Sequence, residues 1–89
     1  MVAPAQPAKP KHPLKKGTKV KALLGESDED FEGKIRETEP GEIGTITGIA
    51  RGRQDGSEGY AYDLTFADTE VWVVVDDCDL DDAERLEVL

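Results

Sequence analysis

The strongest constraint on the fold is the segment 60–77, YAYDLTFADTEVWVVVDD. Large apolar side chains occupy every second position of residues 60–66, which predicts a β-strand with one buried face. Residues 71–75 are β-branched or aromatic throughout and predict a second strand, covered on both faces. The residues between them, 67–70, suit a hairpin loop built around a type I turn. The buried face of this hairpin is then expected to pair Phe66 with Val71, Leu64 with Val73, and Tyr62 with Val75.

Three further strands are expected around this hairpin. Residues 17–23, GTKVKAL, alternate polar and apolar side chains, so Val20 and Ala22 should point inward. In residues 41–49, GEIGTITGI, the two isoleucines at 46 and 49 have opposite parity, which predicts a β-bulge at Gly48. Residues 77–82, DCDLDD, suit a helical turn capped by an aspartate, and residues 84–89 suit a short final strand.

A long acidic connection, residues 25–40, separates the first two strands. Its only large apolar side chains are Phe31 and Ile35, which are expected to hold it against the core. A connection of this length in a small domain is usually functional or folded back on itself.

The amino-terminal segment differs in composition from the rest of the chain. Residues 1–13, MVAPAQPAKPKHP, are rich in proline and lysine and predict a disordered tail before a single domain at 14–89. One cysteine, Cys78, allows no internal disulfide, which suits a reducing cytoplasm. No apolar run reaches the about 20 residues of a membrane span. We therefore expect a cytoplasmic monomer without a membrane segment.

The element order and two sequence patterns resemble SH3-like small β-barrels over about residues 14–89. The segment GEIGTITGI resembles the glycine-and-aliphatic pattern of KOW-type barrels. The segments YDLTF, VWVV and DDCDL resemble accessory barrels such as the one in photosystem I, the variable chain of ferredoxin-thioredoxin reductase, the nitrile hydratase β-subunit barrel and the nitrogen-fixation protein NifZ. The resemblance implies an all-β, SH3-like barrel of about five short antiparallel strands.

Charge is the main clue to the partner. The chain holds 20 acidic and 11 basic residues, and six of the basic ones lie within residues 1–21, so residues 22–89 carry a net charge of −15. Such a surface repels phosphates and anionic membranes, which makes nucleic acid an unfavourable ligand. It favours a protein with a basic surface, or a role as an acidic mimic of nucleic acid.

These observations predict a non-enzymatic protein-interaction module, such as an accessory or assembly factor. A catalytic set is not expected, because the single histidine, His12, lies in the tail and Cys78 lies among acids that disfavour a thiolate. The tryptophan is expected to contribute affinity, and the acidic loop is expected to attract the partner electrostatically. The predicted contact residues are Trp72, Asp28, Asp30, Glu32 and Phe31. The alternative is a nucleic-acid-binding, KOW-like barrel that uses Arg51, Arg53 and Tyr60.

Residues 28–39, DEDFEGKIRETE, also match the spacing of a calcium-binding EF-hand loop. Its ligands would be Asp28, Asp30, Glu32 and Glu39, with Gly33 at the sharp turn. Pro40 opposes the helix that should follow such a loop, so calcium is kept as a minor alternative and no cofactor is predicted.

Overall fold

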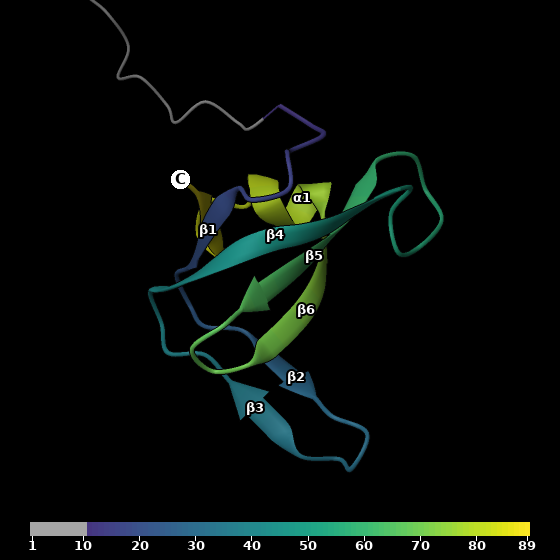
Figure 1. Cartoon of the computed structure of the whole chain (residues 1–89). Helices are drawn as coiled ribbons and strands as arrows, with labels where there is room; N and C mark the ends of the chain where they lie inside the picture. Colours follow the sequence, from purple (N-terminus) through teal and green to yellow (C-terminus); the bar gives the residue numbers. More distant parts are fainter. Residues whose placement is uncertain (1–10) are drawn as a thin grey trace, which may run out of the picture.

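The computed structural model describes residues 11–89, and β-strand is the main regular structure of this part of the chain (Figure 1). In chain order the elements are β1 (Lys19–Ala22), β2 (Ser27–Glu29), β3 (Ile35–Glu37), β4 (Glu42–Arg51), β5 (Tyr60–Phe66), β6 (Val71–Asp76), α1 (Asp77–Asp81) and β7 (Leu86–Val88). All strand pairs are antiparallel and form two sheets. The all-β prediction is thus confirmed.

The larger sheet has the strand order β6-β5-β4-β1-β7. Its β5–β6 hairpin has the predicted register, with Phe66 opposite Val71 and Tyr62 opposite Val75. The predicted irregularity is also present, because the β4–β5 register shifts between Ile46 and Gly48. The bulge does not bring Ile49 into the core, however, since this side chain stays 36% exposed.

The core lies on one face of this sheet, and Leu80 of α1 packs into it together with Leu86 of β7. Alternation along β1 and β5 buries one side of each strand, as predicted from the two-residue period of strands. The fully buried large side chains are Tyr62, Phe66, Ile46, Leu64, Leu80, Leu86, Val20, Val71 and Val75. The prediction that residues 71–75 are covered on both faces is wrong, because Trp72 and Val74 face solvent.

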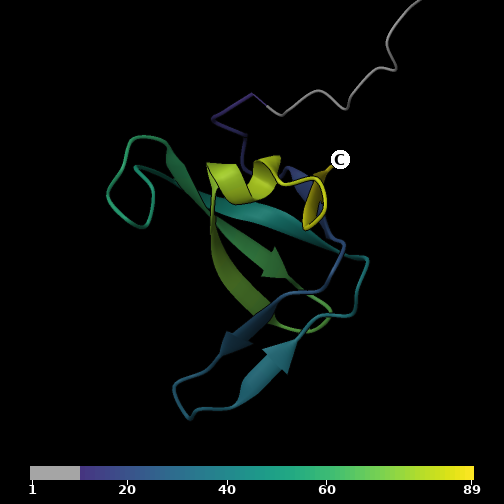
Figure 2. The same ribbon diagram turned by 180° about the vertical axis from the view of Figure 1, so that it is seen from behind.

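The acidic connection is not an irregular loop but a second hairpin, formed by β2 and β3 (Figures 1 and 2). Asp28 pairs with Arg36 across it. Phe31 and Ile35 do not hold this hairpin to the core, since both are largely exposed. Polar contacts attach it instead: Arg85 binds Glu26 through two nitrogens, at 2.5 and 3.1 Å, just before β2 begins.

The helical turn α1 connects the two ends of the larger sheet. Its start is capped as predicted, because the Asp79 carboxylate accepts the N–H of Asp76 at 2.9 Å. No ladder joins β6 to β7 among residues 11–89, so hydrogen bonds do not close this sheet into a barrel. In this same part of the chain, no helix has the length and apolar character needed to cross a bilayer.

Candidate protein-interaction surface

The β2–β3 hairpin lies beside the first residues of β6, at the end of the strand opposite to the β4–β5 loop (Figures 1 and 2). Asp28 makes the contact: its Oδ2 accepts the backbone N–H of Trp72 at 2.8 Å. The other oxygen of this carboxylate, Oδ1, is buried and has no hydrogen-bond donor within residues 11–89. Two of the predicted contact residues, far apart in sequence, are therefore adjacent.

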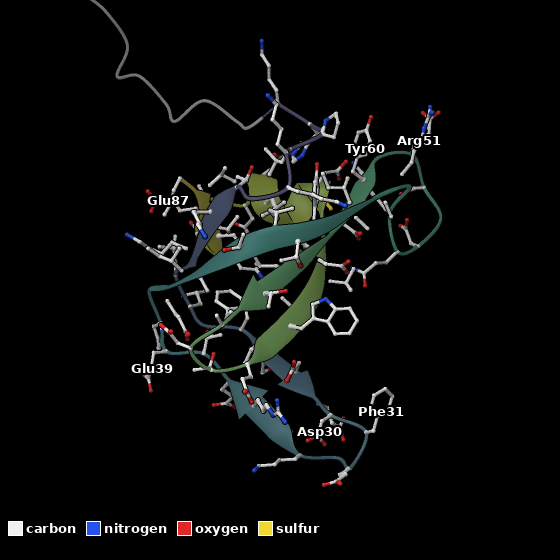
Figure 3. All side chains as sticks on the ribbon, in the orientation of Figure 1. Asp30, Phe31, Glu39, Arg51, Tyr60 and Glu87 are labelled. Atoms are coloured by element: carbon white, nitrogen blue, oxygen red, sulfur yellow. The ribbon has the colours of Figure 1, made fainter. Side chains whose placement is uncertain are left out.

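Asp30 shapes the tip of the hairpin. Its Oδ1 accepts the backbone N–H groups of Glu32 and Lys34, both at 2.9 Å. Arg36 bridges this turn to the main sheet, 3.7 Å from Asp30 and 3.5 Å from Glu70. The ordered turn presents Phe31, whose side chain is fully exposed at the tip (Figure 3).

Trp72 is the largest exposed apolar side chain of the main sheet. It is 57% exposed, and its neighbour on the same strand face, Val74, is 41% exposed. Across the strands this face continues as Thr65, which pairs with Trp72, and Thr47, whose hydroxyl lies 2.9 Å from that of Thr65. The small side chains of this surface leave the indole accessible to solvent.

The predicted acidic residues divide into two groups. Asp28 and Asp30 bind backbone N–H groups, so they hold the hairpin in place. Glu32 is exposed and remains available to a partner. Further exposed acids, which the sequence prediction did not include, lie in the hairpin strands (Glu29 and Glu37) and in the β5–β6 turn (Asp68 and Glu70).

The residues of the calcium hypothesis do not converge. Asp28 and Asp30 direct oxygens at N–H groups, and Glu39 lies at the base of the hairpin, whereas Asp30 lies near its tip (Figure 3). Over the described range 11–89, no group of three or more acidic, histidine or cysteine side chains could hold a metal ion. The arrangement lacks the closely grouped carboxylates that an EF-hand site needs.

The nucleic-acid alternative relied on the β4–β5 loop, and the structure separates its three residues. Arg51 and Tyr60 line an open pocket of about 420 Å³, together with glycines and with Ser57 and Glu58. Arg53 instead points inward, and its Nε lies 2.7 Å from Asp77 Oδ1. Of the two arginines in this alternative, Arg51 is the one that is exposed and outside every ion pair found within residues 11–89.

Asp77 is the organising residue of this loop. Its side chain is only 9% exposed, and Oδ2 accepts the backbone N–H of Tyr60 at 3.1 Å. Burial alone would raise the pKa of Asp77, but the hydrogen bonds from Arg53 and Tyr60 outweigh it and lower the pKa. The hydrogen bond to Asp77 in turn raises the pKa of Arg53. Gly59 is needed here because its φ is +146° and a Cβ would collide with Arg53 and Asp77.

His12 is a residue whose role sequence reasoning missed. The predicted tail, residues 1–13, falls mainly outside the described residues, but His12 lies against the domain. Its Nδ1 is 2.7 Å from the Tyr62 hydroxyl and its Nε2 is 3.0 Å from Asp81, while Leu14 N–H donates to the same hydroxyl at 3.0 Å. Nothing local in a proline-rich segment signals this contact, which depends on α1 and β5 meeting at one place.

Tyr62→Phe is expected to lower the free energy of unfolding by about 1 kcal/mol, because the hydroxyl lost binds both His12 and Leu14. Burial raises the pKa of Tyr62, although the Leu14 N–H partly opposes this. Since the folded pKa lies above the unfolded one, Tyr62 adds a loss of stability as the pH rises past about 10. Urea unfolding at pH 8 and pH 11 should show that the alkaline loss is smaller in the variant; an equal loss in both proteins would contradict this.

No family model, curated protein or solved structure matches this chain. The interpretation of its function therefore depends on the physical features described above.

Proposed function

We propose that this protein is a non-enzymatic protein-interaction module that binds a partner with a basic surface. The observation that carries the proposal is an exposed tryptophan, Trp72, beside a strongly acidic hairpin whose tip presents Phe31. Tryptophan is favoured at the centre of protein interfaces, where it contributes a large area at a small entropic cost. Holding the hairpin against β6 through Asp28 lowers the cost of binding further, since less has to be ordered.

Charge supports the same type of partner. Residues 26–39 contain seven acidic and two basic side chains, and most of the acids are exposed. Carboxylates around an apolar anchor increase the association rate of a basic protein and repel acidic competitors. A role as an accessory or assembly factor, within a larger complex, fits a small domain whose described residues, 11–89, offer a surface of this kind.

An SH3-like barrel is the fold we assign as part of this proposal. It is supported by the order of the elements: strand, long hairpin, three-stranded meander, helical turn and final strand. It is also supported by the ten-residue β4, which is bulged at Gly48 and pairs with both β1 and β5. The exposed Cys78 fits a monomer that works in a reducing compartment such as the cytoplasm.

Capture of partners from an extract of the native cell tests the proposal. Trp72→Ala is expected to weaken the captured interaction at least tenfold, because hot-spot tryptophans contribute about 2 kcal/mol or more. Stability should change little, since the indole is more than half exposed. Affinity is measured by calorimetry with the purified partner.

Leu89→Ala provides the matched control, because Leu89 is 55% exposed but lies at the far end of the domain from the hairpin. Unchanged affinity in Trp72→Ala would contradict the proposal. So would salt-sensitive, saturable binding of RNA or DNA that Arg51→Ala abolishes, because that result favours the alternative use of the β4–β5 pocket.

A further inference from the structure

The outer edge of β6 carries backbone groups that no neighbouring strand uses, since β6 is the last strand of its sheet. In an antiparallel pair, alternate residues direct their N–H and C=O groups toward the partner strand and away from it. The N–H groups of Trp72 and Asp76 bind the side chains of Asp28 and Asp79, which lie off the ladder. Residues 72, 74 and 76 therefore have their backbone groups on the open edge.

Side chains occupy most of this edge but leave one gap. Asp28 takes the N–H of Trp72, Asp79 takes the N–H of Asp76, and Gln54 donates to the C=O of Val74 at 3.3 Å. The C=O of Trp72 and the N–H of Val74 remain, and neither is bonded to another group in residues 11–89. The gap lies between the β2–β3 hairpin and the β4–β5 loop, which flank the two ends of β6 (Figures 1 and 2).

The two open groups suit the addition of one more strand. A strand that pairs opposite Val73 would donate to the C=O of Trp72 and accept from the N–H of Val74, the residues on either side of Val73. We propose that the β6 edge takes up an extended basic segment of the partner protein by β-strand addition opposite Val73. This inference rests on the proposed interaction function and specifies how the partner is bound.

Charge and exposure define the chemistry of that segment. Trp72 and Val74 are exposed on the sheet face next to the gap, so an apolar side chain of the segment can lie against them. Asp28 Oδ1 is buried without a donor in residues 11–89 beside the gap, and a buried acceptor of this type favours a ligand that carries a donor. With exposed acids on the hairpin, such as Glu29 and Glu32, this favours lysine or arginine at the neighbouring positions.

Two peptides test the mode of binding on the full chain. The first is an acetylated seven-residue peptide that alternates lysine and valine; the second has the same side chains but N-methyl groups on every backbone amide. The first is expected to bind and to slow hydrogen exchange of the Val74 amide. The second should bind at least tenfold more weakly, because it cannot donate to Trp72. Equal affinities, or no binding of the first peptide at millimolar concentration, would overturn strand addition.

Val74→Pro removes the open N–H but leaves the backbone groups that face β5 in place. Proline is tolerated on an edge strand where the missing N–H would face away from the sheet. It should weaken the first peptide about tenfold, whereas Val74→Thr, which keeps the N–H and the branched shape, should not. Gln54→Ala frees the C=O of Val74 and is expected to tighten binding about threefold. If the amide spectrum of Val74→Pro shows that this variant does not fold, the Gln54→Ala variant decides the test. Unchanged peptide affinity in Gln54→Ala would then count against the proposal.

Failure of this inference can be separated from failure of the proposed function. If both peptides bind equally and Trp72→Ala weakens both, the interaction surface survives and backbone pairing is rejected. If neither peptide binds and Trp72→Ala has no effect on captured partners, both are rejected. Dimerisation of the chain through β6 without peptide, seen by sedimentation, would identify a second copy as the occupant and overturn the proposal.

Discussion

Arg53→Met is expected to lower the free energy of unfolding clearly more than Arg51→Met does, because it leaves the largely buried Asp77 carboxylate without its cation. The β4–β5 loop should also loosen, since Asp77 holds both Arg53 and the N–H of Tyr60. Urea unfolding at pH 7 measures the loss.

The pH dependence of this variant gives a second readout. In the native protein the pKa of Asp77 is lowered, so its contribution is present above the ordinary pKa of 3.8 and is lost as the pH falls through the lower, folded value. In the Arg53→Met variant the Asp77 carboxylate lacks the hydrogen bond that favours its charged form most, so protonation costs the variant less stability than it costs the native protein. The difference in stability between the two proteins should therefore shrink as the pH falls below 3.8 and vanish only below the folded pKa of Asp77.

Arg51→Met is the matched control for Arg53→Met. Arg51 is the last residue of β4, two positions before Arg53; it is exposed and takes part in no ion pair of the described chain, so its replacement should cost less than about 0.5 kcal/mol. Equal losses in the two variants would show that the Arg53–Asp77 pair does not hold the loop.

Gly44→Ala is expected to lower the free energy of unfolding by about 2 kcal/mol, although alanine suits the backbone of a strand. A Cβ at this position would lie 2.8–3.0 Å from three atoms of the Phe66 ring, and that ring is fully buried. The core has to shift to admit one methyl group. Thermal and urea unfolding of the single variant measure the cost.

Phe66→Leu should rescue Gly44→Ala in part, because the smaller side chain removes the atoms that the new methyl group meets. Phe66→Leu alone is expected to cost about 1 kcal/mol through the cavity it leaves. In the double variant the two losses should be less than additive by about 1 kcal/mol. Strict additivity would mean that Gly44 is required for another reason than contact with Phe66.

The predictions that were confirmed rest on the alternation of side chains between the two faces of a β-strand. The register of the β5–β6 hairpin, the inward side chains of β1 and the bulge near Gly48 follow from side chains that alternate between two faces of a strand. Residue spacing was enough in these cases because the buried face of a strand specifies its register.

The predictions that failed concern which apolar residues become buried. Phe31, Ile35 and Trp72 all have side chains typical of a core, yet all three are exposed. The hairpin is attached by Asp28 and by the Arg85–Glu26 pair, which are polar contacts between residues distant in sequence. Hydropathy says nothing about such contacts, so the acidic segment was predicted as a loop held by its hydrophobic residues.

The candidate site shows the same division. Trp72, Phe31 and the acidic segment were predicted as a contact surface from residue type, and their grouping beside β6 required the folded chain. The structural use of Asp28 and Asp30 could not be predicted, because a carboxylate that binds a backbone N–H looks in sequence like one that faces solvent.

Residue type and local spacing are enough to establish the strand periodicity, the acidic charge and the lack of a cysteine pair. The binding of Arg53 by Asp77, the binding of His12 by Tyr62 and the open edge of β6 are visible in the folded chain alone. These features arise where segments distant in the chain meet, because a side chain acquires its partner, its burial and its pKa only from neighbours that folding brings to it.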